Sequence, residues 1–220
     1  MKKIIFLFLL CMTCIFSVNA QFTVQRAFSR IDFSSLPYTF YKDCSFDEYF
    51  TVENPNNIIP DKLYLNFQLT EYHLARDYPE AMGTLSKKFN LGNDVYLGLV
   101  DFGGALEWQT FSLITANSAG SIIDTLEVSV MSGWIMPKQF KITENREVIV
   151  YRLVPTSSTS IRMSNFRYVD AYITETVYQI DMAGQFIKMS EKRTPNSRTY
   201  TRDELNDKKT NLWDWFNVKY

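Results

Sequence analysis

The sequence contains very little histidine and cysteine. Of its 220 residues one is histidine, His73, and three are cysteines, of which only Cys44 lies beyond residue 20. A single cysteine excludes an intramolecular disulfide in that part of the chain, so its stability has to come from a buried core. One histidine and one cysteine are also too few for a structural zinc site without carboxylates. We therefore predict no metal site and no cofactor.

The motifs of nucleophilic catalysis and nucleotide binding are missing as well. No Gly-x-Ser-x-Gly elbow, Gly-x-x-x-x-Gly-Lys loop or Gly-x-Gly-x-x-Gly turn is present. Carboxylates flank Cys44 and disfavour its thiolate, so we expect Cys44 and His73 to be structural side chains and not a catalytic dyad. We predict no catalytic residue. The paired carboxylates of a glycosidase follow no fixed motif, so this class stays open.

Neither sign of charge dominates, and long apolar runs are rare. Lysine and arginine number 23 against 24 acidic residues, which gives no electrostatic reason to expect a nucleic acid as partner. The 46% hydrophobic and 21% charged residues are typical of a globular domain. Beyond residue 20 no stretch approaches the roughly 20 apolar residues of a membrane-spanning helix. We expect no transmembrane helix in the mature chain.

The first 20 residues have the three parts of a secretory signal peptide. Lys2 and Lys3 precede an apolar run over residues 4–16, and small residues stand before the cut, ending at Ala20. The pattern predicts cleavage after Ala20. The protein is therefore expected to be exported, to the periplasm or to the outside of the cell.

Alternating hydrophobicity and turn residues predict a series of strands. Asn and Gly at the turns tolerate the left-handed backbone that tight hairpins require. The expected strands cover residues 61–69, 95–102, 108–115, 122–130, 140–142, 148–153, 167–180 and 186–189, with turns at 117–120 and 181–184. The predicted fold is mainly β, an antiparallel sheet of consecutive hairpins, sandwich-like or a partly open barrel, with minor helix.

Two segments differ from this pattern. Apolar residues at helical spacing predict a short helix within residues 71–89. Residues 192–201 are polar and predict a linker, and Thr201 to Glu204 fits a capping box at the start of a helix. The predicted organisation is a signal peptide (1–20), one β domain (21–192), and a linker with an aromatic C-terminal segment docked on the domain (193–220).

Aromatic residues, 15% of the chain, supply the candidate binding residues, because sugar faces stack on exposed rings. On the predicted strand 167–180, Tyr168, Tyr172 and Tyr178 share a face with Thr174 and Thr176. The alternative is that Tyr and Thr are simply favoured in half-exposed strands. The predicted ligand-binding residues are Trp134, Tyr168, Tyr172, Tyr178, Trp213 and Trp215.

The leader, the order of the strands and two hairpins are similar to small exported β-rich proteins of Bacteroidota that have no known activity. The hairpins run through residues 119–124 (AGSIID) and from Tyr178-Gln179-Ile180 to Gly184-Gln185-Phe186. The resemblance transfers no activity. It implies one candidate modification, O-glycosylation of Thr125, because Asp124-Thr125-Leu126 resembles the Asp-Ser/Thr-hydrophobic site of that phylum.

These observations favour an exported, non-catalytic binding or envelope-associated interaction protein whose partner is a protein or a glycan. The alternatives are a carboxylate-dependent glycan hydrolase and a periplasmic immunity or inhibitor protein. Loss of turnover on replacing pocket carboxylates would identify the hydrolase. One tight protein partner would identify the inhibitor.

Overall fold

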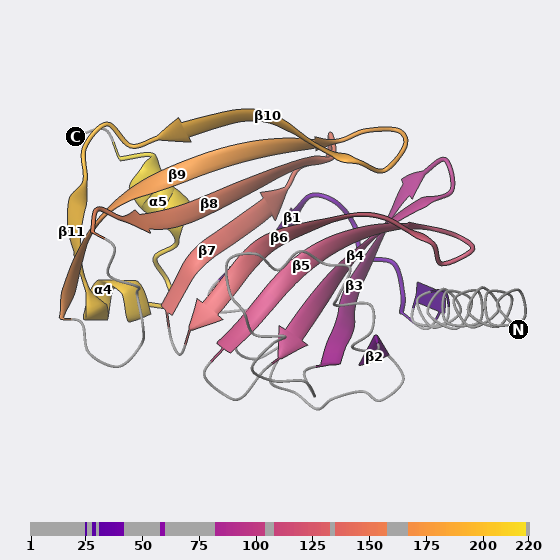
Figure 1. Cartoon of the computed structure of the whole chain (residues 1–220), viewed down its shortest axis with the longest axis horizontal. Helices are drawn as coiled ribbons and strands as arrows, with labels where there is room; N and C mark the ends of the chain where they lie inside the picture. The colour runs from indigo at the N-terminus through magenta and orange to yellow at the C-terminus, as the bar shows by residue number, and fades with distance from the viewer. Residues whose placement is uncertain are drawn as a thin grey trace, which may run out of the picture.

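The computed structural model describes residues 25, 28–29, 31–41, 58–59, 82–103, 108–132, 135–157 and 167–218. The leader, Cys44, His73, Trp134, the expected strand at 61–69 and residues 71–81 of the expected helix lie outside them. The described residues form a mainly β structure of consecutive antiparallel hairpins, as the sequence predicts (Figure 1).

The sheet has eleven strands among the described residues, and two short helices follow them. The strands are β1 (Tyr38–Thr39), β2 (Ile58–Ile59), β3 (Met82–Gly92), β4 (Val95–Gly103), β5 (Trp108–Asn117), β6 (Ile122–Ser132), β7 (Ile135–Ile142), β8 (Glu147–Pro155), β9 (Tyr168–Ile180), β10 (Phe186–Arg193) and β11 (Arg198–Thr201). The helices are α4 (Arg202–Asn206) and α5 (Leu212–Phe216). The main path of the sheet runs from β10 through β9, β8 and so on to β2.

The hairpin turns form where the sequence predicts them. In the β5–β6 turn the side chain of Asn117 accepts a hydrogen bond from the amide of Ser121, and Gly120 has a φ of 82°. In the β9–β10 turn Asp181 accepts in the same way from Gln185, and Gly184 has a φ of 89°. Side-chain oxygens and left-handed glycines therefore stabilise both turns.

Residues 82–89, expected to end a helix, belong instead to strand β3. Its pairing with β4 shifts register between Leu85 and Lys87, which indicates a bulge. The shift breaks the regular alternation of this strand: Leu85 is buried, and beyond the shift the neighbours Lys88 and Phe89 are both buried. The strand forms because it buries these side chains against β4, and this tertiary gain overrides the local pattern.

The expected linker is also partly strand. Within residues 192–201, β10 continues to Arg193, and Arg198–Thr201 forms β11, which pairs with the beginning of β9. Tyr200 is buried although its neighbours are exposed. One inward side chain in four is too weak a pattern to predict a strand.

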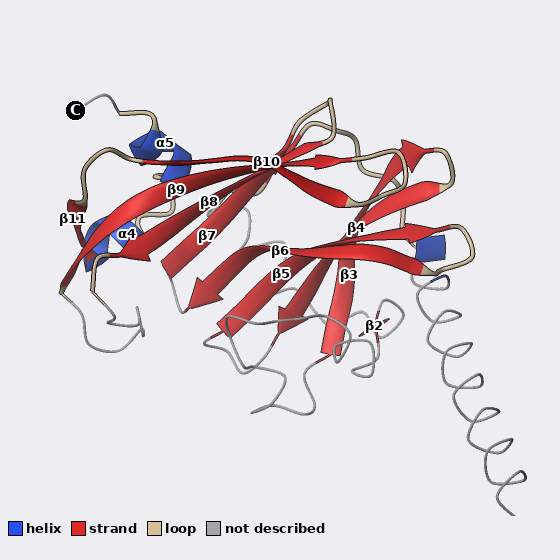
Figure 2. Ribbon diagram, turned by 45° about the horizontal axis from the view of Figure 1, so that its top comes forward, coloured by secondary structure: helices blue, strands red, loops and turns tan. Residues whose placement is uncertain are grey.

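The sheet folds between β6 and β7. These strands pair only at Val130↔Lys138 and Ser132↔Ile135, and β7 pairs with β1 beyond that point, at Lys141 and Ile142. Figure 2 shows β3–β6 and β7–β10 as two fans of strands. One core lies on the inner side of both fans, and we call it the inner core. It includes Phe40, Phe89, Leu97, Leu99, Phe111, Leu113, Val128, Phe140, Ile142, Val148, Val150 and Ile180.

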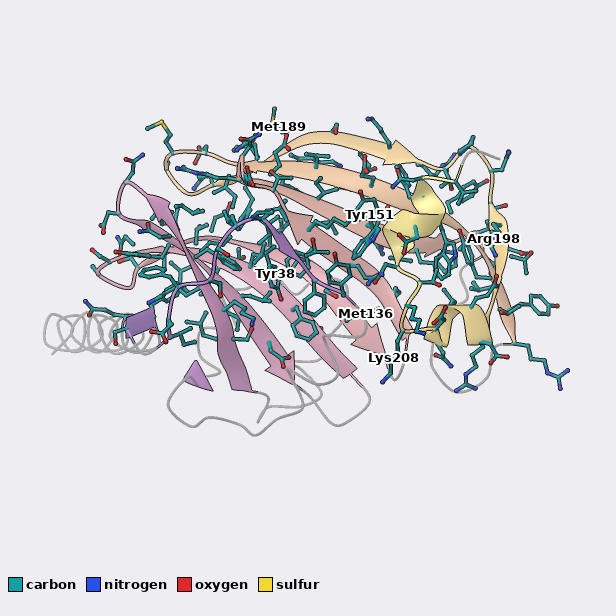
Figure 3. The ribbon with its side chains drawn as sticks, turned by 180° about the vertical axis from the view of Figure 1, so that it is seen from behind. Tyr38, Met136, Tyr151, Met189, Arg198 and Lys208 are labelled. Atoms are coloured by element: carbon teal, nitrogen blue, oxygen red, sulfur yellow. The ribbon has the colours of Figure 1, made fainter. Side chains whose placement is uncertain are left out.

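A second core, the outer core, lies on the other side of β8 and β9. Tyr151, Leu153 and Ile173 pack there against residues of α4 and α5, and Figure 3 shows Tyr151 beside α5. The predicted capping box is present: Thr201 accepts from the amide of Glu204, whose carboxylate accepts from the amide of Thr201. The aromatic C-terminal segment thus covers the sheet.

Candidate ligand-binding site

Hydrogen-bond register aligns side chains of β7–β10 in rows across the inner side of the sheet. Cross-strand partners point to the same side. Val148 and Val150 belong to the inner core, so Arg152, two residues further along β8, points to the same side. Arg152 pairs with Lys138 of β7 and with Thr174 of β9, and Thr174 pairs with Arg193 of β10. We call Lys138, Arg152, Thr174 and Arg193 the cation row.

The rows become more polar with distance from the inner core. Ile142, Val148 and Tyr178 form a row that ends in Lys188. The next row contains Phe140, Val150, Thr176 and Glu191, and the cation row follows it. Beyond the cation row Val154 pairs with Tyr172. The inner side of β7–β10 therefore grades from apolar to cationic within a few residues of each strand.

Two cations of the row, Lys138 and Arg193, have defined neighbours. Lys138 forms an ion pair with Glu127 of β6 (Nζ to Oε1, 2.7 Å), and the two side chains are only 15% and 14% exposed. The guanidinium of Arg193 lies 4.2 Å from the ring centroid of Tyr172, a cation–π contact. Thr174 donates its hydroxyl to the backbone carbonyl of Arg152 at 3.4 Å.

Glu191 is the carboxylate that β10 contributes to these rows. Its hydrogen bond from Lys188 holds its pKa below the usual value, and Thr176 and the charge of Arg152 add to the effect. Glu191 is therefore ionised at neutral pH. It balances part of the positive charge on this side of the sheet.

Of the predicted binding tyrosines, Tyr172 adjoins the cation row. Tyr178 lies two rows inward and packs against the inner core. Tyr168, at the start of β9, is 65% exposed. The prediction that they share one face agrees with their spacing on β9, and the ring of Tyr172 contacts Arg193 of the cation row.

The other predicted site residues lie elsewhere. Trp213 and Trp215 are buried in the outer core. Thr125 lies on β6 opposite Ile114, half-buried, and its amide donates to Asp124 at 2.8 Å. Trp134 is outside the described residues. The tryptophans of α5 are thus part of the packing of the sheet.

Asp101 on β4 is a buried carboxyl that sequence reasoning missed. It pairs with Phe111, whose ring contacts Phe40 in the inner core. Burial raises the pKa of Asp101 to about 7, and its Oδ1 atom has no hydrogen-bond partner among the described residues. In the sequence, the one sign of this carboxyl was an acidic residue within an otherwise apolar predicted strand. Such a carboxyl is half protonated near neutral pH.

A second group of charges lies on the opposite side of the sheet. The Nζ atom of Lys141 lies 4.1 Å from the ring centroid of Trp213, and burial lowers the pKa of Lys141 against the opposing effects of Asp214 and Glu175. Burial also raises the pKa of Tyr151, and its hydrogen bond to Glu175 adds to this. These contacts bind α5 to β7–β9.

Within the described ranges no three His, Cys, Asp or Glu side chains are grouped as a metal would need. The helices described there are too short or too polar to cross a bilayer.

Comparison with known proteins adds no assignment: no protein family, curated protein or solved structure matches this chain. The cation row was missed by the sequence reasoning because its members come from four strands. No spacing within one segment reveals it.

Proposed function

We propose that the chain is an exported, non-catalytic binding protein that holds its ligand on the inner side of β7–β10, at the cation row and Tyr172. The predicted leader supports export. The observation that carries the binding site is the direct cross-strand pairing of Lys138 with Arg152. Glu127 balances the charge of Lys138 and Glu191 lies near Arg152, whereas Arg193 is exposed at the end of this row, where a ligand that carries negative charge can reach it.

The setting of the row also suits binding. Arg193 is held on the ring of Tyr172, which limits the freedom that a ligand would otherwise have to remove. The strands on either side fix Arg152 and Thr174 at known register positions. Recognition groups on rigid strands lose less conformational entropy on binding than groups on loops.

Site-specific photocrosslinking in the native envelope tests this proposal. A benzophenone side chain replaces Tyr172, and the control replaces Lys192, which is exposed on β10 and points to the other side from Arg193. We expect adducts at position 172 that are absent at position 192. No adduct at 172, or the same adducts at both positions, contradicts the proposed site.

A carboxylate-dependent glycan hydrolase is the second candidate, and Asp101 is the observation that favours it. A general acid needs a pKa near the working pH, and burial gives Asp101 that property. The test is release of reducing ends from envelope glycans. Release that the Asp101→Asn variant abolishes would establish the hydrolase, whereas no release by the native protein rejects it.

A further inference from the structure

The charge on the inner side of β7–β10 identifies the chemical class of the ligand. This step rests on the proposed binding site. We infer that the ligand is an acidic glycan, a sugar chain that carries carboxylate or sulfate groups, and that Arg152 and Arg193 bind its anionic groups while Thr174 and Tyr172 contact its sugar units.

The first support is the local excess of positive charge. The four rows that contain Tyr172, Thr174, Thr176 and Tyr178 hold four cations and one carboxylate from β7–β10. Glu127 of β6 supplies a second carboxylate through its ion pair with Lys138. Within the part of the chain that the structure describes, these side chains thus carry a formal charge of about two units positive.

This excess is not a consequence of composition. The whole chain has a net charge of −1 and an isoelectric point near 5.9. A strongly basic surface that would suit nucleic acid is therefore not expected. A small cationic site on a slightly acidic protein suits a ligand that carries single negative charges at intervals along its length.

The second support is the kind of cation. Arginine presents planar donors that match the two oxygens of a carboxylate or sulfate group. Arg152 and Arg193 stand on β8 and β10, with β9 between them, so their backbones are about 10 Å apart. Two such groups can contact charges on different units of one chain.

The third support is the polar and aromatic surface between and beside the arginines. Thr174 pairs with both Arg152 and Arg193 and offers a hydroxyl oxygen to sugar hydroxyls. The rings of Tyr172 and of the exposed Tyr168 lie on the same side of β9. Tyrosine combines an apolar ring face with a polar tip, which suits a sugar unit.

A matched pair of ligands tests the inference. Oligogalacturonate carries one carboxylate per sugar, and its methyl ester has the same backbone without the charge. We expect the purified protein to bind oligogalacturonate at least tenfold more tightly than the ester in isothermal titration calorimetry, and the affinity to fall as salt is raised from about 0.05 to 0.5 M. Sulfated dextran and unmodified dextran form the parallel pair for sulfate.

Variants that each remove one positive charge locate the contacts between the protein and the glycan. Arg193→Gln removes an exposed cation of the row, and Lys192→Gln removes the adjacent cation on the other side of β10. We expect Arg193→Gln and Arg152→Gln each to weaken binding about tenfold, as for loss of a charge-assisted hydrogen bond, and Lys192→Gln to leave it unchanged. Thermal melting confirms that each variant is folded.

Three results would overturn the inference: equal binding of acid and ester, binding of neither acidic glycan, or equal loss in Arg193→Gln and Lys192→Gln. Preference for duplex DNA over both acidic glycans would also reject it. These results leave the proposed site standing if crosslinks at position 172 persist. The absence of those crosslinks contradicts the proposed function itself, whatever the glycan assay shows.

Discussion

The carboxylate of Asp124 on β6 accepts a hydrogen bond of 2.8 Å from the backbone amide of Phe186, the first residue of β10. Close by, the hydroxyl of Thr115 donates to the carbonyl of Gly184 at 2.5 Å. These bonds join the β5–β6 hairpin to the β9–β10 hairpin. They hold the two fans of the folded sheet together above the inner core.

The first prediction concerns this junction. Asp124→Ala removes the acceptor of the Phe186 amide and of the Thr125 amide. Because hydrogen bonds to charged groups contribute more than neutral ones, we expect a loss of about 2–3 kcal/mol in the free energy of unfolding, measured by urea denaturation. Glu144→Ala, in the exposed β7–β8 turn, is the control. A loss no larger than the control's would show that Asp124 does not join the fans.

The second prediction compares two glycines with positive φ. A methyl group at Gly184 would meet side-chain atoms of Ile123 at 3.0 Å and Val95 at 3.1 Å, whereas at Gly92 the nearest atom is 4.0 Å away. Gly92→Ala is expected to cost about 1 kcal/mol, from backbone strain alone. Gly184→Ala adds overpacking and should cost at least about 1 kcal/mol more. Equal losses in thermal or urea unfolding would contradict this packing.

The third prediction is a pH dependence due to Asp101. Its pKa is raised from 3.8 to about 7 in the folded protein, so between these values the folded state binds more protons than the unfolded state. Stability therefore falls as pH rises through this window. Asp101→Asn removes the effect, and its stability relative to the native protein should increase by a few kcal/mol from pH 4 to pH 7.

Urea denaturation at several pH values measures this difference. A constant difference between Asp101→Asn and the native protein would show that Asp101 is not buried in its protonated form. The conservative Asp170→Asn, at an exposed position of β9, serves as the control.

The fourth prediction concerns the attachment of α5. Gln139 is fully buried, and its amide donates to Asn211 at 2.9 Å and accepts from the amide of Leu212 at 2.8 Å. Gln139→Leu removes the donor to the Asn211 side chain and the acceptor of the Leu212 amide, and each loss lowers the free energy of unfolding by about 1–3 kcal/mol. We expect faster hydrogen exchange at the amides of α5. Unchanged exchange in α5 would contradict this role of Gln139.

Local patterns predicted several elements correctly. The alternation and the turn residues between Val95 and Met189 predicted the hairpins, because period-two hydrophobicity and left-handed turns are properties of short segments. The capping box at Thr201 and Glu204 was predicted for the same reason. The helix expected within 71–89 was wrong for residues 82–89, because the register shift between Leu85 and Lys87 disturbs the alternation of β3.

The candidate site was predicted only where it lies on one strand. The spacing of Tyr172 and Thr174 placed them on one face of the strand from 167 to 180. The cation row stayed hidden because Lys138, Arg152 and Arg193 become neighbours only through the pairing of β7 with β8, of β8 with β9 and of β9 with β10. The sequence shows Asp101 only as one charge in an apolar strand, and its burial beside the inner core comes from the tertiary structure.

The sequence by itself determined the hairpins between Val95 and Met189, their turns and the first turn of α4, and its scarcity of histidine and cysteine disfavoured a catalyst built on those residues. Tertiary structure alone decided the fold between β6 and β7, the contact of Asp124 with Phe186, and the alignment of Lys138, Arg152 and Arg193 in one row across the sheet. The physical reason is the distance along the sequence over which each effect acts. Backbone preference and alternation act over a few residues, whereas register and packing bring together residues as distant in the sequence as Tyr38 and Ile142.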